Sequence, residues 1–485
     1  MASSQRYRHS LLTQPDNNTR QKRIWNLLRH IPSFMFRFFR LLSFVVFLLP
    51  AFVVFLYHYF SCDRIAVYYG VKDAIGERKW LSRHYLDMYG SRAHVNSNEE
   101  TKKKPVVIFL TGGAWIIGYR MWGCLLARAL VPFGILVIIP DYHNFPKVNI
   151  KGMVDDVDMS IQWVLDHVEE FGGDRNRVVL VGQSAGAHIG GVVVAKKVWD
   201  WIQKQKSNKG GGGSNGEDCR HLKSTYSPQQ LCGFITTSSP HNLVTMRSVF
   251  HRHGLSASVQ RSIFGGVSCS NDDNLIDDVV KSVAACDDLD VFELWSPYHL
   301  VKKCQTEYIK LISEGNANRS SSNESNNNES TDQLKDIFPK LCVIHGTSDK
   351  TVPVEEAIEF LSLLSNLQIP ALSKIYPGWS HTDPILEMPM LGNHLYHRDV
   401  YELVCRWTGR RITETDDGIG FYNGNTERNR SEHKSDNAET IGMMDDSSKA
   451  AEGDFNLIPF DETHSILRPI CPTALVEIAR VCNPF

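Results

Sequence analysis

Short, continuously apolar segments that alternate with longer amphipathic ones limit most strongly how this chain can fold. The short segments lie at residues 105–110, 135–139, 178–181, 231–235 and 341–344. Between the second and the third, residues 153–171 carry apolar side chains three or four positions apart, as on one face of a helix. Strands that are apolar on both faces belong to parallel sheets covered by helices. The pattern therefore predicts an α/β fold: a mostly parallel sheet with helices on both faces.

The composition argues against several other classes of protein. Of the 485 residues, 42% are hydrophobic and 22% are charged, which is unlike a disordered chain, a collagen or a coiled-coil rod. The 52 Lys and Arg nearly balance the 54 Asp and Glu, whereas nucleic-acid binding needs a concentrated basic face. We therefore expect no nucleic-acid partner. The 11 cysteines form no Cys-x-x-Cys and no Cys/His cluster of the zinc type, so we expect no metal site and no cofactor.

Residues 41–60 are apolar and carry no formal charge. A helix of this length spans about 30 Å, the thickness of the hydrocarbon core of a bilayer. A buried core helix would show a polar face, and a cleaved signal peptide would begin earlier, so we expect one transmembrane helix that anchors the chain. Residues 1–40 are strongly basic. The positive-inside rule places them in the cytosol and the bulk of the chain in the lumen.

Composition also divides the chain into segments. We expect a basic N-terminal segment (1–40), the membrane anchor (41–60), a connecting segment (61–104), a catalytic domain (105–410), a disordered acidic tail (411–455) and an apolar C-terminal segment (456–485). Within the catalytic domain, residues 204–218 are rich in Gly and residues 314–332 in Asn and Ser. Such compositions bury little apolar surface, so we expect two flexible inserts.

A candidate nucleophile follows one of the predicted strands directly. Residues 182–186 read GQSAG and stand between the run 178–181 and a helix-compatible segment. In a nucleophile elbow the serine occupies a strained strand-to-helix turn, and small neighbours let the backbones pass closely. Ser184 is then the nucleophile, and the N–H of Ala185 points at the carbonyl oxygen of the substrate. The alternative is a Gly-rich turn without chemistry, because so short a motif also occurs by chance.

A second glycine-containing turn follows the first predicted strand, where residues 111–115 read TGGAW. We expect the N–H groups of Gly112 and Gly113 to complete an oxyanion hole together with Ala185, although a Gly-Gly turn after a strand is also common without that role. Thr111 stands where lipases and esterases usually have His. We also expect Trp115 to contact the substrate.

The acid and the base of a catalytic triad are expected in that order after the serine. Asp349 lies in the loop after the run 341–344, and His381 lies in a turn 32 residues later. His381 is expected to take the proton of Ser184 and to give it to the leaving alkoxide, while Asp349 orients the imidazole. Three rivals fit less well. His188 follows the serine too closely, His345 precedes the acid, and Asp383 is too close to His381 in the sequence. These motifs together predict a serine esterase.

Residues 106 to about 408 resemble the α/β-hydrolase fold and, within it, the plant-type isoprenylcysteine α-carbonyl methylesterases. The resemblance rests on residues 111–119 (TGGAWIIGY), 141–146 (DYHNFP), 171–174 (FGGD), 182–188 (GQSAGAH) and 251–255 (HRHGL). Thr111 in place of His is itself a mark of this family. Two departures are His143, where the family usually has Arg, and residues 239–241 (SPH), where it has a Gly-Gly-Tyr-like run.

The resemblance implies hydrolysis of the α-carboxyl methyl ester of an S-prenylated cysteine, with release of methanol. It also implies an endoplasmic reticulum or Golgi membrane location, with the bilayer as a partner. Prenylated proteins face the cytosol, whereas the flanking charges place the domain in the lumen. Either the substrate is a small prenylcysteine ester that crosses membranes, or the domain faces the cytosol. The alternatives for function are a general carboxylesterase or lipid deacetylase and, less expected, a binding protein that kept the fold without catalysis.

Overall fold

The structure is a computed structural model that describes only part of the chain. The residues described are 63–70, 83–91, 103–209, 225–265, 291–319, 333–409, 469 and 472–482, together with some of residues 39–60. The chain forms two compact units. The smaller unit comprises Met1–Tyr57 and Pro469–Pro484, and the larger comprises His58–Arg468 and Phe485.

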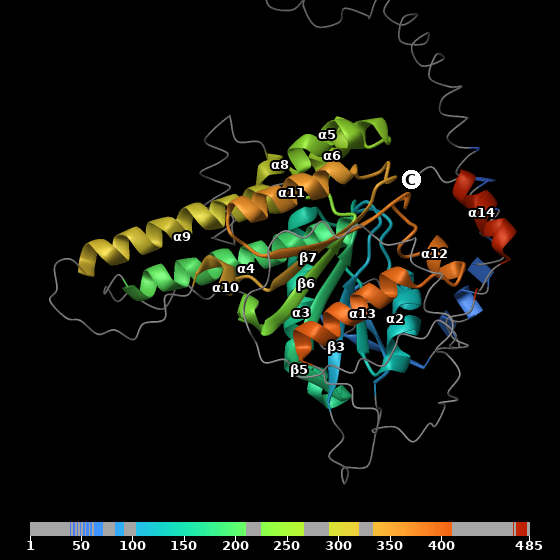
Figure 1. Ribbon diagram of the computed structural model, residues 1–485, viewed down its shortest axis with the longest axis horizontal. Helices are drawn as coiled ribbons and strands as arrows, with labels where there is room; N and C mark the ends of the chain where they lie inside the picture. Colours follow the sequence, from blue (N-terminus) through green and yellow to red (C-terminus); the bar gives the residue numbers. More distant parts are fainter. Residues whose placement is uncertain are drawn as a thin grey trace, which may run out of the picture. The chain divides into compact units, whose positions relative to one another are not determined.

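The larger unit is built on one eight-stranded sheet with the strand order β1-β2-β4-β3-β5-β6-β7-β8 (Figure 1). The strands are β1 (Arg64–Tyr68), β2 (Tyr85–Tyr89), β3 (Lys104–Leu110), β4 (Leu136–Pro140), β5 (Gly173–Gln183), β6 (Leu231–Thr237), β7 (Lys340–Gly346) and β8 (Ala371–Tyr376). Strand β2 pairs antiparallel with both of its neighbours, and every other pairing is parallel. The predicted mostly parallel α/β sheet is therefore confirmed.

The five apolar runs of the sequence lie in β3 to β7, in the middle of the sheet. Three strands were missed because they lack such a run. Strand β8 lies at one edge and is only partly buried, while β1 lies at the other edge. Strand β2 contains Asp87, a fully buried carboxylate that Arg64 and Arg120 each contact at 3.0 Å. Residues 61–104, which we assigned as a connecting segment, therefore supply two strands of the sheet.

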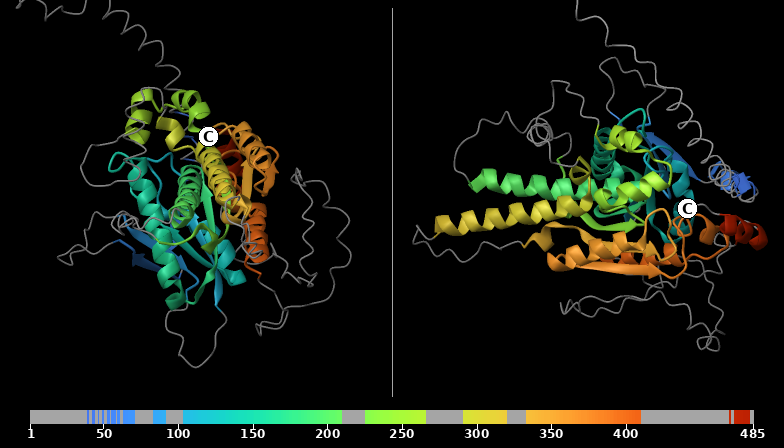
Figure 2. Two further views of the ribbon diagram at one scale, coloured as in Figure 1. Left: turned by 90° about the vertical axis from the view of Figure 1, so that its left-hand side faces the viewer. Right: turned by 90° about the horizontal axis from the view of Figure 1, so that it is seen from above.

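Helices cover both faces of the sheet (Figure 2). The α-helices of the larger unit are α2 (Cys124–Leu130), α3 (Ile150–His167), α4 (Ala185–Lys209), α5 (Leu243–Arg252), α6 (Ala257–Phe264), α8 (Val291–Leu294), α9 (Pro297–Arg319), α10 (Leu334–Ile337), α11 (Val354–Asn366), α12 (Glu387–Met390) and α13 (Leu395–Thr408). Short 3-10 helices lie at Arg120–Gly123, Val131–Phe133, Val168–Phe171 and Pro228–Gln230.

Side chains alternate between the two faces of each strand, so each strand packs against helices on both faces of the sheet. On β3, Val106, Ile108 and Leu110 belong to the core that the sheet forms with α3, α4, α9 and α11. On the opposite face α2 and α13 cover the sheet. There the ring of Trp407 from α13 fills the space beside Gly233, where an added Cβ would lie 2.0 Å from a ring carbon. The sheet is thus buried on both sides, as a parallel sheet requires.

Helices α4 and α9 run side by side beyond the sheet (Figure 2). The ion pair between Lys206, near the end of α4, and Glu307, in the middle of α9, joins them at 2.6 Å. Residues 204–209 and 314–319, where we expected the two flexible inserts to begin, are instead the last residues of these helices. The sequence prediction erred because Gly, Asn and Ser dominate only later in each insert. The remainder of both inserts, and the expected acidic tail at 411–455, lie outside the described residues.

In the smaller unit, every described residue between 39 and 60 that belongs to it is helical. Helix α14 (Thr473–Cys482) belongs to the same unit, with Val476 and Ala479 buried and Val481 exposed. Among the residues that the structure describes, no helix is both long enough and apolar enough to cross a membrane. The expected span at residues 41–60 is described only in part.

Candidate active site

The topology brings three distant side chains to one edge of the sheet. Ser184 directly follows β5, Asp349 lies three residues after β7, and His381 lies in the turn after β8. These strands run parallel, so their carboxyl ends meet at the same edge. Ser184 and His381 are 197 residues apart in the chain, yet their side chains are in contact. The edge is therefore where a site assembled from separate loops is expected.

The three side chains form one hydrogen-bonded row. His381 Nε2 lies 2.8 Å from Ser184 Oγ, and His381 Nδ1 lies 2.7 Å from Asp349 Oδ2. The other carboxylate oxygen of Asp349 accepts the backbone N–H groups of Thr351 and Val352, at 2.9 and 2.8 Å. All three triad side chains are less than a tenth exposed. Because the carboxylate can only accept, Nδ1–H donates to it and the lone pair of Nε2 faces the serine hydroxyl.

The carboxylate of Asp349 stays charged although it is buried. Burial alone would raise its pKa, but the nearby His381 and hydrogen bonds from His345 and His381 outweigh burial and hold the pKa well below its usual value. An ionised carboxylate at this position stabilises a positive charge on the imidazole of His381. The row can therefore hold a proton taken from Ser184.

The turn at Ser184 is strained and closely packed. Ser184 has φ of 54°, in the left-handed region that is unfavourable for a residue with a side chain. Its N–H donates to Thr237 O at 2.8 Å, which fixes the turn against β6. The flanking glycines have no room for a side chain. An added Cβ on Gly182 would lie 2.5 Å from Ala187 Cα, and one on Gly186 would lie 2.3 Å from Leu110 O. These contacts explain the spacing of the GQSAG motif.

The loop of residues 111–118, which we call the oxyanion loop, passes beside this turn. An added Cβ on Gly112 would lie 2.2 Å from Gln183 Oε1 and 2.9 Å from Ser184 Cβ. Among the described residues, the N–H groups of Gly112, Gly113 and Ala185 have no hydrogen-bond partner. Ala185 is also the first residue of α4, where the helix leaves its N–H groups unbonded. Gly112 and Ala185, two of the three expected donors, thus lie beside Ser184 with their N–H groups unbonded.

The side chain of Trp115, in the oxyanion loop, is buried. It is 2% exposed, and its ring packs edge-on against Phe250 of α5 and Phe264 of α6 at centroid distances of 5.4 and 5.0 Å. Its indole N–H donates to His188 Nδ1 at 3.3 Å. In this arrangement the side chain of Trp115 packs the oxyanion loop against α5 and α6. A contact between Trp115 and a substrate stays a prediction.

The rival side chains from the sequence occupy supporting positions. His188 bridges Trp115 and the carbonyl of Trp295, and burial lowers its pKa to about 4, so it stays neutral. His345 Nε2 donates to Val352 O at 2.8 Å and lies 3.4 Å from Asp349 Oδ2. Asp383 accepts the N–H of Ser380 at 2.7 Å and thereby shapes the turn that holds His381. Sequence reasoning missed the role of His345, although its spacing of four residues from Asp349 was visible.

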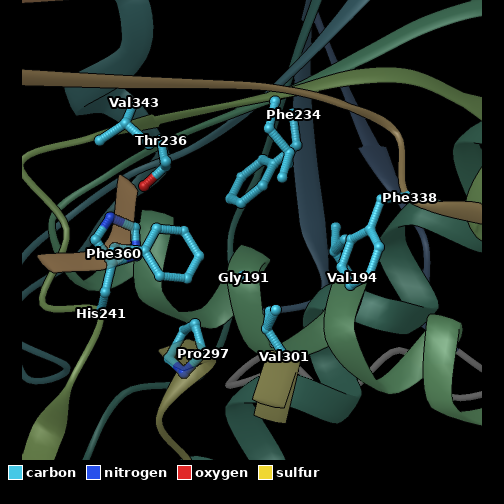
Figure 3. A pocket seen from close by; sticks show the side chains of 11 residues that line it. Gly191, Val194, Phe234, Thr236, His241, Pro297, Val301, Phe338, Val343 and Phe360 are labelled. Atoms are coloured by element: carbon cyan, nitrogen blue, oxygen red, sulfur yellow. The ribbon is translucent and has the colours of Figure 1, made fainter. Parts of the chain in front are cut away.

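A small cavity of about 20 Å³ lies between the sheet and the helices α4, α9 and α11 (Figure 3). His241 lines it and stacks on Phe360 with ring centroids 4.0 Å apart. Neither ring nitrogen of His241, nor the hydroxyl of Thr236, has a partner among the described residues. Burial keeps the pKa of His241 well below its usual value, so the ring is neutral. No triad side chain lines the cavity, which is therefore part of the core beneath the site.

One cluster combines side chains of the kind that bind metals. His84, His143 and Asp156 each offer an atom, and these atoms lie within 4.8 Å of one another. His84 Nε2 is 2.7 Å from one oxygen of Asp156, and His143 Nδ1 is 2.7 Å from the other. This cluster was not predicted from the sequence, because its members come from three separate segments of the chain.

Two family models match parts of the chain. The model described as BD-FAE matches residues 93–250, and that of the Prolyl oligopeptidase family matches residues 292–415. The first range contains Ser184 and the oxyanion loop. The second contains Asp349 and His381.

Comparison with curated proteins finds relatives over most of the chain. The probable isoprenylcysteine alpha-carbonyl methylesterase ICMEL1 of Oryza sativa subsp. japonica is 31% identical over 73% of this chain. This chain covers 66% of that protein, just under two thirds of its length. The isoprenylcysteine alpha-carbonyl methylesterase ICME of Arabidopsis thaliana is 28% identical over 76% of this chain and 69% of the length of that protein. Among solved structures, an inhibited esterase B from Lactobacillus rhamnosis is 12% identical, with a TM-score of 0.49, over 76% of this chain and 97% of that chain.

The sheet and the relatives agree with the resemblance seen in the sequence. The sheet has the mostly parallel order expected of the fold, and the serine stands at a strained turn between β5 and α4. The curated relatives at 28–31% identity extend over about 73% of the chain. The chain is therefore a relative of the isoprenylcysteine alpha-carbonyl methylesterases, with the α/β-hydrolase fold.

Proposed function

We propose that this chain is a membrane-anchored serine esterase that hydrolyses the α-carboxyl methyl ester of S-prenylated cysteine. The observation that carries the proposal is the row from Asp349 through His381 to Ser184, with contacts of 2.7 and 2.8 Å, beside the unbonded backbone N–H groups of Gly112 and Ala185. This arrangement has a nucleophile, a base, an acid that orients the base, and donors for a developing negative charge. Those are the parts that acyl transfer from an ester needs.

In the first half of the reaction, Ser184 Oγ attacks the carbonyl carbon of the ester while His381 Nε2 takes the hydroxyl proton. The carbonyl oxygen becomes an oxyanion that accepts the N–H groups of Gly112, Gly113 and Ala185. Each such donor stabilises the transition state by about 3 kcal/mol. The tetrahedral intermediate then collapses, and the departing methoxide takes the proton from His381 and leaves as methanol. The acyl group remains on Ser184.

In the second half, a water molecule replaces methanol. His381 takes a proton from the water as its oxygen attacks the acyl carbon, and the same N–H groups bind the second oxyanion. Collapse of this intermediate breaks the bond to Ser184 Oγ, which recovers its proton from His381. The product is the free carboxyl group of the prenylated cysteine. Throughout both halves Asp349 stays ionised and holds the imidazole in one tautomer.

The choice of substrate rests on the relatives and on the sequence. The curated relatives are named isoprenylcysteine alpha-carbonyl methylesterases. A prenylated cysteine ester partitions into membranes, and the uncharged residues 41–60 suit a single-pass anchor that would keep the site near such a substrate. We place the enzyme at the endoplasmic reticulum or Golgi membrane, acting on a protein C-terminus or on a small prenylcysteine ester.

Parallel assays of the full-length protein test the reaction and the substrate separately. Farnesylcysteine methyl ester is compared with a short-chain nitrophenyl ester for wild type, for Ser184→Ala, and for Ser207→Ala at the exposed end of α4 as a matched control. We expect Ser184→Ala to lose activity on both esters and Ser207→Ala to keep it. A preference for the short ester by orders of magnitude would overturn the substrate. Activity retained in Ser184→Ala would overturn the mechanism.

Membrane anchoring and orientation have their own test. Full-length protein in microsomes should resist extraction by alkaline carbonate, and a chain without residues 1–60 should be released. Glycosidase-sensitive mass at Asn318, Asn323 or Asn328 would place the domain in the lumen, whereas cleavage by protease added to intact microsomes would place it in the cytosol. Release of the full-length protein by carbonate would overturn the anchor.

A further inference from the structure

The segment between β4 and α3, residues 141–146, holds the oxyanion loop at three of its carbonyl groups. We call this segment the clamp. The contacts are Tyr142 Oη to Thr111 O (2.7 Å), Phe145 N to Trp115 O (2.9 Å) and Asn144 Nδ2 to Gly118 O (2.8 Å). They lie at the beginning, the middle and the end of the oxyanion loop. In each contact the clamp donates and the loop accepts.

These contacts determine which way the oxyanion loop presents its backbone. A peptide unit is planar, so fixing the direction of a C=O also fixes the direction of the N–H of the next residue. The clamp holds Thr111 O, whose peptide partner is the N–H of Gly112, one of the three donors without a partner. The clamp therefore sets where an oxyanion donor points although it contacts no reacting atom.

The clamp is in turn anchored by Asp156 of α3. One oxygen of Asp156 accepts both the backbone N–H of His143, at 2.9 Å, and the ring Nδ1–H of His143, at 2.7 Å. Its other oxygen accepts His84 Nε2–H at 2.7 Å. Burial opposes ionisation of Asp156, but the hydrogen bonds from His143 and His84 outweigh burial and lower its pKa to about 2. The anchor is thus a buried carboxylate that stays charged at any pH where an esterase works.

A second carboxylate fixes the beginning of the clamp. Asp141 is 1% exposed and accepts the guanidinium groups of Arg83, at 3.0 Å to its Nε, and of Arg120, at 3.2 Å. Arg83 also donates to Gly118 O, at the end of the oxyanion loop. Its backbone N–H donates to His143 Nε2 at 3.2 Å. Arg83 therefore contacts both the clamp, at Asp141 and His143, and the end of the oxyanion loop, at Gly118.

The hydrogen bond from the backbone N–H of Arg83 also bears on whether the cluster of His84, His143 and Asp156 can bind a metal ion. Because His143 Nε2 accepts an N–H, the proton of the neutral ring is on Nδ1, which donates to Asp156. A metal would need the lone pair of Nδ1 and would move that proton to Nε2, against the N–H of Arg83. The cluster is therefore arranged for hydrogen bonding and not for a metal ion.

We propose that Asp156 is a positioning residue for ester hydrolysis, which acts through His143 and the clamp to hold the oxyanion donors in place. This inference rests on the proposed function. Its effect should fall on the transition state, because the oxyanion forms only there. A shift of the donors by about 1 Å is enough to lower turnover about 100-fold.

The first test replaces one carboxylate and spares its neighbour on the same helix. Asp156→Asn is compared with Asp158→Asn, whose side chain contacts Lys197 of α4 at 3.2 Å. On whichever ester the wild type hydrolyses, we expect Asp156→Asn to lower kcat about 10- to 100-fold with KM changed less than about 3-fold. Asp158→Asn should keep the wild-type kcat. Equal kcat in Asp156→Asn and wild type, or a change in KM alone, would overturn the proposal.

Variants at Asn144 and His143 keep the test decisive if Asp156→Asn folds poorly. Asn144→Ala removes one contact of the clamp and no charge, and we expect a loss in kcat of about 10-fold with an unchanged melting temperature. His143→Arg keeps donors that face Asp156, so it should retain kcat, whereas His143→Ala should not. Loss of kcat that follows the melting temperature across all the variants would show a merely structural role and overturn the proposal.

A readout without turnover separates failure of this proposal from failure of the proposed function. The rate at which a fluorophosphonate modifies Ser184 depends on the same donors and does not require the correct ester. We expect this rate to fall about 10-fold or more in Asp156→Asn and Asn144→Ala and to stay unchanged in Asp158→Asn. Equal rates in all the variants would overturn the proposal. Tight, stoichiometric zinc binding that His84→Ala abolishes would do so as well.

Discussion

The two flanks of Ser184 are built in different ways. On one flank, Asp349 and His381 reach the serine through side chains, with two hydrogen bonds of 2.7 and 2.8 Å. On the other flank, the oxyanion loop offers only backbone N–H groups, and three contacts from the clamp hold its carbonyl groups. A few side chains carry the first flank. On our proposal, the second depends on a chain of contacts that begins at Asp156, which bonds to His84 and His143.

This difference shows what each kind of site demands of a sequence. A side-chain site needs particular residue types in a particular order, and a substitution there removes the chemistry outright. A backbone site tolerates many residue types within the loop but needs remote anchors to orient it. We call Ser184, His381 and Asp349 the relay and their side of the site the relay flank. Substitutions on the relay flank should therefore abolish activity, and those on the oxyanion flank should reduce it in steps.

Loss of the relay side chains should have the largest effect. Ser184→Ala and His381→Ala should each lower kcat about 10⁵-fold, because either removes the proton transfer that makes the serine a nucleophile. The double variant should be no worse than either single variant, since the two act as a unit. Steady-state kinetics on one ester checks this, and additive losses would show that the two side chains act independently.

Asp349→Asn should cost about 10³- to 10⁴-fold in kcat, because the amide favours the wrong tautomer of His381. In the wild type, the pKa of Asp349 lies well below its usual value, so the carboxylate stays ionised on the acid side. Between pH 7 and pH 4.5, the logarithm of kcat/KM should then show no second ionisation from this carboxylate. A slope of two in that range would contradict the ionised Asp349.

Crowding on the oxyanion flank should cost less than loss of the relay. Gly112→Ala places a Cβ 2.2 Å from Gln183 Oε1 and 2.9 Å from Ser184 Cβ, so the oxyanion loop must move. We expect kcat to fall about 100-fold, the value of one displaced donor. Comparison of kcat with the melting temperature checks the cause. An unchanged kcat would show that the N–H of Gly112 does not bind the oxyanion.

The anchor of the clamp should also contribute to stability in a pH-dependent way. The pKa of Asp156 is lowered to about 2 from an ordinary value of 3.8. Its contribution, about 2 kcal/mol, is therefore fully present above pH 4 and is lost as the pH falls toward 2. Denaturant unfolding of wild type and Asp156→Asn at pH 7 and pH 3 measures the difference. A difference that grows on acidification would contradict the assignment.

The smallest effect is expected at the outer surface of the oxyanion loop. Ile117 is 70% exposed. Ile117→Ser should raise KM for a prenylcysteine ester about 2- to 5-fold, because an apolar contact is lost. KM for an acetyl ester should stay unchanged. An equal change for both esters would show that Ile117 acts on the loop and not on the prenyl group.

The sequence allowed most of the fold and the relay flank to be predicted. Central strands are buried on both faces, so their apolar runs are visible without the structure, and the order of Ser184, Asp349 and His381 is itself a signal. The edge strands β1 and β8 lack that signal because they are only partly buried. The clamp was recognised only as the matching segment 141–146, because its contacts join residues that show no periodicity and lie tens of positions apart.

An acyl group on Ser184 is the intermediate that distinguishes this mechanism most directly. Full-length protein mixed with a nitrophenyl ester, quenched within the first turnover and digested, should carry one acyl group, on the peptide that contains Ser184. His381→Ala treated in the same way should carry none. An acyl group on another residue, or hydrolysis with no acylated peptide in a protein whose Ser184→Ala variant is fully active, would contradict the account.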